Sequence, residues 1–216
     1  MTLVGVVGAG GFGRECLRLV RAHASQMPGP TTVVFVEENP KHTSINATPV
    51  VSFEEFCAND IERVFSVAIA DSGTRERLAN TAIASGAKAF SVIAKTAIVG
   101  DGVTFGEGAI LHDNTMLTAD STIGRFFHCN YYSFVPHDCT IGDFVTFGPG
   151  VRLGGNVIIG DHAYIGAGAM VRQGTVDKPV RIGKGAVVGM GAVVLTNVPD
   201  GAIVAGVPAK RINGRS

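Results

Sequence analysis

Residues 141–165 read IGDFVTFGPGVRLGGNVIIGDHAYI, and an apolar side chain returns in this stretch at every sixth position. The same step of six continues in both directions through apolar residues: Val99, Phe105, Leu111, Leu117, Ile123, Cys129, Val135, Ile141, Phe147, Leu153, Ile159, Ile165 and Val171. Glycine often follows the apolar residue, and the residue four places on is usually small or β-branched, with Phe127 as the exception. A period of six fits neither an α-helix nor one alternating strand, so it predicts a solenoid of short parallel strands.

The repeat slips once, between Gly174 and Val180, and resumes from Ile182 onward. Residues 175–179 (TVDKP) are therefore extra, and we expect them to form a loop at one corner of the solenoid. The sequence does not indicate a partner for this loop.

The residues before the repeat alternate between apolar strands and helical patterns. We expect strands over 3–7, 33–36, 64–70 and 91–93, with one helix after the loop at 8–13 and another opening at Asp71. This alternation predicts half of a doubly wound α/β sheet.

The loop GAGGFG (8–13) lets backbone N–H groups approach a phosphate at the start of a helix, although the glycines alone could also make only a tight turn. Two acidic residues end the second strand, where a mononucleotide fold meets a ribose or a base. The candidate nucleotide-binding residues are Gly8, Gly10, Gly11, Gly13, Glu37, Glu38 and Ser72. An NAD-dependent dehydrogenase is the poorer interpretation, because a dinucleotide domain usually needs two such halves.

The composition favours a small-molecule substrate. Lys plus Arg equals Asp plus Glu at 18 each, so net charge attracts neither nucleic acid nor a membrane surface, and we expect neither as a partner. No secretory signal or membrane span is expected, and the four cysteines form no CxxC pair, which fits reduced thiols in the cytoplasm.

The repeat, with the ending GVPAKRI at 206–212, resembles the hexapeptide-repeat acyltransferases, whose repeat folds as a left-handed parallel β-helix of triangular coils. With the small domain in front, the arrangement is similar to the NeuD/PglD-like sugar acetyltransferases. The resemblance implies an α/β + β fold: a Rossmann-like nucleotide-sugar-binding domain over 1–93, then the acetyltransferase β-helix, about five coils, over 94–216.

The resemblance also implies an activity. It predicts an acetyl-CoA-dependent N-acetyltransferase that acts on the amino group of a nucleotide-linked amino-deoxy sugar in glycan biosynthesis. Acetyl-CoA is then the co-substrate, no metal is required, and the chain forms a homotrimer with active sites between subunits.

The segment SFVPHDC (133–139) holds the candidate catalytic residues. The register of the repeat points Val135 and Cys139 inward and leaves His137 and Asp138 outward. A thiol buried among apolar side chains is usually inert, so an acyl-cysteine mechanism is not favoured. His137 and Asp138 match the family's His-acid pair, which implies that His137 is the general base and that Asp138 fixes its tautomer. A surface histidine in a turn is the plain alternative.

The resemblance assigns further site residues. Gly155 corresponds to the backbone donor for the oxyanion, Ala167 and Met190 lie along the acetyl-CoA groove, and Asn130 corresponds to a residue that holds the acceptor sugar. Lys210 and Arg211 are candidates for the phosphates of coenzyme A, or they only make the C-terminus more soluble.

Several positions depart from the family pattern. Phe12 replaces a histidine in the glycine loop, Thr146 replaces a second histidine, and Tyr131 and Tyr132 are bulkier than the residues expected there.

Two other functions stay open at this point: O-acetylation of a sugar or sialic acid, and a non-catalytic β-helix used as a binding scaffold. A metal pair at His112 and Asp113 is not favoured, because no third ligand is near in sequence. The sequence leaves UDP, dTDP and GDP as equal choices for the nucleotide.

Overall fold

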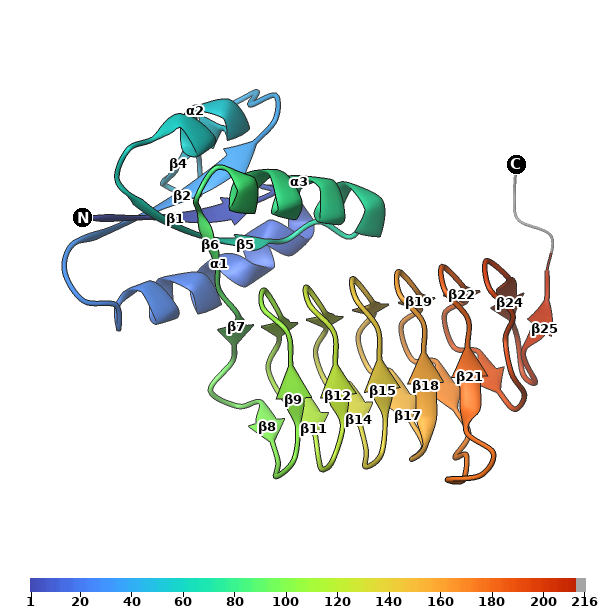
Figure 1. Cartoon of the computed structure of the whole chain (residues 1–216). Helices are drawn as coiled ribbons and strands as arrows, with labels where there is room; N and C mark the ends of the chain where they lie inside the picture. The colour runs from blue at the N-terminus through green and yellow to red at the C-terminus, as the bar shows by residue number, and fades with distance from the viewer. Residues whose placement is uncertain (213–216) are drawn as a thin grey trace. The chain divides into compact units, whose positions relative to one another are not determined.

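The computed structural model describes residues 1–212 and divides into two compact units, the first over Met1–Val92 and the second from Ile93 onward (Figure 1). Among the described residues, no helix is long and apolar enough to cross a membrane.

The first unit is an α/β sheet with the strand order β3-β4-β2-β1-β5-β6 (Figure 1). Its strands are β1 (Thr2–Val7), β2 (Thr31–Glu37), β3 (Ser44–Ile45), β4 (Thr48–Ser52), β5 (Glu62–Val67) and β6 (Lys88–Ala89). All neighbours run parallel except β3, which is antiparallel to β4. The order reverses between β1 and β5, which is where an open α/β sheet forms its ligand crevice.

Three helices cover this sheet: α1 (Gly11–Ala24) on one face, and α2 (Phe53–Ala58) and α3 (Ser72–Ala84) on the other (Figure 1). α2 starts with a capping box between Ser52 and Glu55, and the Asp71 side chain caps α3 by accepting from the Thr74 N–H at 2.8 Å. α1 starts inside the glycine loop, three residues before the predicted start.

The first unit is larger than the predicted half sheet. β3, β4, α2 and β6 were not predicted, because β3 and β6 have two residues each and β4 begins Thr-Pro, so none shows a readable period. The strand predicted at 91–93 forms as β7 (Val92–Ile93), but it is not the last strand of the α/β sheet. That strand is β6, and β7 is a neighbour of β10 in the repeat.

The second unit is a parallel β-helix with three faces (Figure 1). The first face contains β7, β10 (Ile110–Leu111), β13 (His128–Cys129), β16 (Thr146–Phe147), β19 (Tyr164–Ile165), β22 (Val187–Val188), β24 (Ile203–Ala205) and the antiparallel β25 (Lys210–Arg211). The second face contains β8 (Ile98–Val99), β11 (Met116–Leu117), β14 (Phe134–Val135), β17 (Arg152–Leu153), β20 (Met170–Val171) and β23 (Val193–Val194). The third face contains β9 (Thr104–Phe105), β12 (Thr122–Ile123), β15 (Thr140–Ile141), β18 (Val157–Ile159) and β21 (Val180–Ile182).

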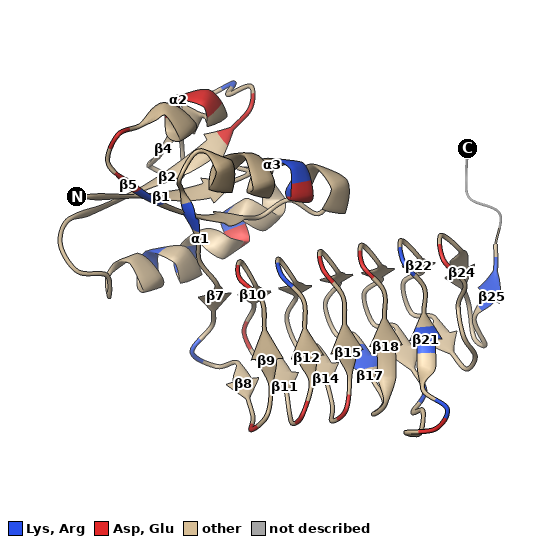
Figure 2. Cartoon of the chain, in the orientation of Figure 1, with Lys and Arg blue, Asp and Glu red and all other residues tan. Residues whose placement is uncertain are grey.

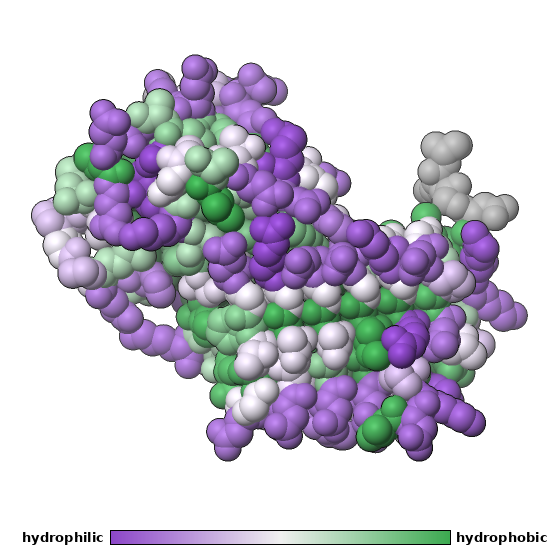
Figure 3. All heavy atoms as spheres, viewed as in Figure 1, coloured by the Kyte–Doolittle hydropathy of each residue, from purple (hydrophilic) through white to green (hydrophobic). Residues whose placement is uncertain are grey.

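Equivalent strands of successive coils pair in parallel. Leu117 thus pairs with Val135, and Ile123 pairs with Ile141. The inward apolar side chains form one continuous core from Leu111 to Val204. Phe127 fills a position that is small in other repeats and packs its ring edge-on against Phe147, with centroids 5.0 Å apart. In Figure 3 hydrophilic side chains gather on the turns, and a less polar band follows the strands between them.

The turns form three corners. The first corner follows the strands of the first face, the second corner follows those of the second face, and the third corner follows those of the third face. Residues 175–179 lie at the second corner between β20 and β21, which confirms the predicted loop.

The third corner carries a column of stacked rings. Phe126, Phe144 and His162 each occupy a left-handed turn position, and their ring centroids lie 5.3 and 5.4 Å apart. The Arg125 guanidinium lies 4.9 Å from the centre of the Phe144 ring, and it also pairs with Asp143 at 3.5 Å. Stacking and the cation–π contact both stabilise this column.

Candidate active site

The second corner presents His137 and Asp138 to solvent, with half of each side chain exposed. The His137 Nδ1 lies 2.7 Å from the Asp138 Oδ2. A neutral imidazole that donates its Nδ1–H to the Asp138 carboxylate across this contact has a lone pair on Nε2. This arrangement can take up a proton from a bound group.

Gly155 lies one coil further along the same corner, directly against the imidazole. A Cβ atom at this position would lie 2.5 Å from the His137 Cε1 and 2.7 Å from its Nε2, so only glycine leaves the ring in place. The Gly155 carbonyl accepts from the Gly174 N–H at 2.9 Å, whereas no described residue accepts from the Gly155 N–H. A backbone donor is thus available beside the lone pair of His137.

Cys139 is buried in the core beneath this pair, as the register predicted. Its Sγ lies 3.6 Å from the carbonyl oxygens of His137 and Gly154. Burial raises the pKa of this thiol, which keeps it protonated at neutral pH.

Three other predicted residues of the β-helix, Asn130, Ala167 and Met190, lie at the first corner, and Lys210 and Arg211 form β25. The Asn130 Nδ2 donates to the Phe147 carbonyl at 2.7 Å, so part of its hydrogen-bonding capacity serves the fold. Ala167 and Met190 stack further along this corner, where the Gly191 N–H donates to the Ala167 carbonyl at 2.8 Å. Met190 is 80% exposed. One chain therefore places His137 and Gly155 at one corner and these three residues at another.

The second face separates the two corners and carries exposed apolar side chains together with one exposed cation, Arg152. Ile98 is 56% exposed, Met116 39% and Met170 50%, each at the outward position of its strand. The equivalent outward residues on the third face are Thr104, Thr122 and Thr140.

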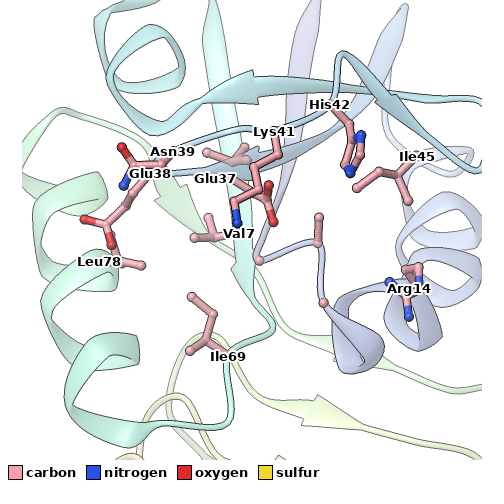
Figure 4. Close-up of a pocket in the computed structure, with 14 residues that line it drawn as sticks. Val7, Arg14, Glu37, Glu38, Asn39, Lys41, His42, Ile45, Ile69 and Leu78 are labelled. Carbon is pink, nitrogen blue, oxygen red and sulfur yellow. The ribbon is translucent and has the colours of Figure 1, made fainter.

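In the first unit, a cavity of about 450 Å³ opens at the carboxyl ends of β1 and β2 and beside Ile69, two residues after β5 (Figure 4). Four of the predicted nucleotide-binding residues line it: Gly8, Gly10, Glu37 and Glu38. The other three, Gly11, Gly13 and Ser72, lie at the starts of α1 and α3 and are not among the lining residues.

The glycine loop has the geometry of a close turn. Gly8 has a φ of +100°, and a Cβ at Gly13 would overlap the Gly8 carbonyl oxygen, so the two glycines let α1 pack against the end of β1. A Cβ atom added at Gly10 would have no neighbouring atom within 4 Å, so the backbone there is open toward the cavity.

The two acidic residues after β2 differ in their surroundings. Both oxygens of Glu38 accept from Arg77 of α3 at 2.8 Å, and this hydrogen bonding lowers the pKa of the Glu38 carboxyl. Glu37 has no such partner among the described residues and is the carboxylate available to a ligand.

The sequence interpretation missed three residues that line this cavity, Arg14, Lys41 and His42, of which Arg14 and Lys41 bring positive charge to it (Figure 4). Arg14 directly follows the glycine loop, so the sequence could have indicated its place beside a bound phosphate. Lys41 and His42 lie in the loop after β2, where no periodic pattern predicts the direction of a side chain. Arg75 was expected only at the start of a helix and was not predicted to lie beside a binding site. It is fully buried, donates to the Ile69 carbonyl at 2.9 Å beside the cavity, and burial lowers the pKa of its guanidinium to about 9.

Over residues 1–212, no cluster of three or more His, Cys, Asp or Glu side chains could hold a metal ion. His112 is buried and its ring lies 4.3 Å from that of Tyr131, which gives it a packing role beside Asn130.

Comparisons with known proteins match both units. The model of the bacterial transferase hexapeptide (six repeats) matches residues 133–173, and that of the hexapeptide repeat of succinyl-transferase matches residues 156–196. The GDP-perosamine N-acetyltransferase of Escherichia coli O157:H7 is 39% identical over 154 residues, which are 70% of either chain.

Two solved structures resemble nearly the whole chain. WeeI from Acinetobacter baumannii AYE is 43% identical, with a TM-score of 0.94 over 98% of this chain and 100% of WeeI. Perosamine N-acetyltransferase from Caulobacter crescentus, solved as a histidine-to-asparagine mutant with CoA and GDP-perosamine, is 30% identical, with a TM-score of 0.87 over 98% and 97% of the two chains. These matches confirm the predicted fold class, a Rossmann-like unit followed by a left-handed β-helix.

Proposed function

The chain belongs to the family of hexapeptide-repeat sugar N-acetyltransferases, and from this premise we propose that it transfers the acetyl group of acetyl-CoA to the amino group of a GDP-linked amino-deoxy sugar. The observation that carries the proposal is the contact of His137 with Asp138 on one side and Gly155 on the other. Two of the named relatives, those from Escherichia coli O157:H7 and Caulobacter crescentus, are perosamine N-acetyltransferases named or solved with GDP-perosamine, and this favours N- over O-acetylation and GDP over UDP or dTDP.

In this mechanism the neutral amine attacks the thioester carbonyl and forms the new C–N bond. The Nε2 of His137 takes the proton that the nitrogen sheds, and Asp138 stabilises the resulting imidazolium. The Gly155 N–H donates to the oxyanion of the tetrahedral intermediate. Collapse breaks the C–S bond, and the imidazolium returns its proton to the thiolate of coenzyme A. No acyl-enzyme forms, which agrees with the buried Cys139.

The cavity of the first unit would hold the nucleotide. The glycine loop and the cations at Arg14 and Lys41 suit a diphosphate, and Glu37 suits hydroxyl or N–H donors of the nucleoside.

A homotrimer would assemble the complete active site. The two corners with predicted site residues border the same face, whose outward side chains are apolar except for Arg152, so packing this face against the next chain brings His137 of one subunit near the first corner of its neighbour. Three such contacts close a ring. Asn130, Ala167 and Met190 of the neighbour then line the groove for the acceptor sugar and acetyl-CoA.

We place this reaction in the cytoplasm. Acetyl-CoA and nucleotide sugars are made there, and all four cysteines are free thiols.

The experiment measures thiol release from acetyl-CoA with GDP-perosamine, with UDP- and dTDP-linked amino sugars, and with sialic acid. We expect turnover with GDP-perosamine and a loss of about 10³-fold or more in His137→Ala. Turnover with a hydroxyl acceptor alone would contradict N-acetylation. Full activity in His137→Ala would show that His137 is not the general base.

A further inference from the structure

We propose that the loop at 175–179 and the two arginines beside it bind the phosphate groups of coenzyme A. The inference rests on the proposed use of acetyl-CoA and gives a role to the one insertion in the repeat. A cavity of about 480 Å³ opens beside the loop, and Arg172, Lys178 and Arg181 line it, with Asp177 as the opposing charge. Three cations against one carboxylate make it a site for a polyanion.

The cations of this cavity differ from Arg125 and Lys184, two other cations of the β-helix, in the absence of an internal ion-pair partner. Arg125 pairs with Asp143 at 3.5 Å, and Lys184 lies 3.8 Å from Asp161, both at the third corner. By contrast, the three cations beside the loop form no ion pair with a described residue. Their charge is therefore available to a ligand.

The charge of the side chains at the second corner changes from negative to mainly positive along the β-helix (Figure 2). Its early turns carry Asp101, Asp120 and Asp138, whereas the turn at 172–179 carries Arg172 and Lys178 against one carboxylate, Asp177. Coenzyme A has a matching asymmetry: the thioester end is neutral, and the far end carries a diphosphate and a 3′-phosphate. The acidic part would lie beside the amine and the basic part beside the phosphates.

The distance along the corner suits the coenzyme. A backbone hydrogen bond connects His137 to Asn156 in the next coil, and another connects Gly155 to Gly174 in the coil after that. The loop therefore starts two coils beyond the catalytic pair. Neighbouring strands lie about 4.8 Å apart, which makes two coils about 10 Å. The pantetheine arm is comparable to three or four extended residues, about 10–14 Å.

Internal hydrogen bonds fix the loop. Thr175 and Lys178 exchange backbone hydrogen bonds of 3.1 Å in both directions, and the Lys178 N–H also reaches the Thr175 hydroxyl at 3.1 Å. A turn held in this way lowers the ordering cost of binding. The rival basic pair, Lys210 and Arg211, lies on β25 at the end of the first face.

The test compares CoA with dephospho-CoA, which lacks the 3′-phosphate. Calorimetry on the full chain should show CoA affinity falling about 30-fold or more in Arg172→Gln/Lys178→Gln/Arg181→Gln, with the preference for CoA over dephospho-CoA reduced. In turnover assays KM for acetyl-CoA should rise much more than kcat falls. Asp177→Asn should shift CoA affinity in the opposite direction, about twofold tighter.

Lys184→Gln is the matched control, an exposed cation at another corner, and it should leave CoA affinity unchanged. Unchanged affinity in the triple variant, or a larger loss in Lys210→Gln/Arg211→Gln, would overturn the proposal. If the triple variant fails to fold, Arg172→Gln and Lys178→Gln tested singly answer the same question. Failure of the proposed function looks different: the wild-type chain would bind CoA in calorimetry and yet acetylate no amino sugar.

Discussion

The absence of a side chain at Gly155 provides the space that the His137 imidazole occupies. The two residues act as a pair, since a donor for the oxyanion and an acceptor for the amine proton must both reach the same tetrahedral centre. Misplacing the ring by about 1 Å is enough to lower the rate by about 100-fold.

Gly155→Ala is therefore expected to reduce kcat by about 100-fold with little change in folding. The new methyl group would lie 2.5–2.7 Å from the imidazole and would push it away from Asp138. Steady-state kinetics with saturating acetyl-CoA measures the effect, and a thermal melt checks the fold.

The matched control is Gly73→Ala, a methyl group added at a position where the nearest atom is 3.8 Å away. It should retain full activity. If Gly155→Ala is equally active, the ring and the glycine do not form a catalytic pair.

Cys139→Ala is expected to keep kcat within about twofold. The pKa of this thiol is raised by burial, so little thiolate exists at neutral pH, and the proposed transfer needs no nucleophile from the protein. Mass spectrometry during turnover provides a second readout, and an acetylated Cys139 would contradict direct transfer.

The sequence predicted the surroundings of these residues correctly because a period of six determines which side chains face the core. The buried position of Cys139 and the exposed positions of His137 and Asp138 follow from that period and are confirmed. The catalytic roles stay predictions. Lys41 and His42 could not be placed, because a loop without a period gives no information about the direction of its side chains.

At the scale of elements, the ring column of the third corner shows how turns without glycine are stabilised. Left-handed backbone is unfavourable for bulky residues, and stacking between coils offsets the cost. Phe144 lies in the middle of the column, between Phe126 and His162.

Phe144→Ala should lower the free energy of unfolding by about 3 kcal/mol, since the ring is buried and stacked on both sides. Tyr132→Ala is the comparison, because Tyr132 has the same left-handed conformation at the first corner but is 63% exposed. Urea unfolding should show a loss below about 1 kcal/mol for Tyr132→Ala. Equal losses would mean that stacking does not stabilise the column.

Elements with long patterns were predicted, and short ones were not. β1, β2, β5 and the strands of the repeat each carry an apolar run or a fixed period. β3 and β6, with two residues each, depend on their neighbours in the sheet, and no local signal specifies them. The strand at 91–93 was found but assigned to the wrong sheet, because pairing is a tertiary property.

For the whole molecule, we expect Met116→Asp to separate the subunits. Met116 is 39% exposed on the second face between the outward side chains of Ile98 and Phe134, and a carboxylate there would be buried without a cationic neighbour in a trimer. Light scattering should show monomers, and acetyl transfer should fall with assembly because the active site loses its second half.

Thr104→Asp makes the same kind of change at an outward position of the third face and should leave a trimer. A wild-type chain that is monomeric and active would contradict the shared site.

The stacked coils also act as a molecular ruler. Every turn of the β-helix adds the same increment of height, so the separation between the imidazole and the basic loop can change only in steps of about 4.8 Å. Deleting one whole coil between Gly155 and the loop would preserve the core register but shorten that separation by one step. Such a shortened enzyme would fit an acyl carrier with a shorter arm. The number of coils between the imidazole and the loop would therefore determine the length of the acyl donor that the enzyme accepts.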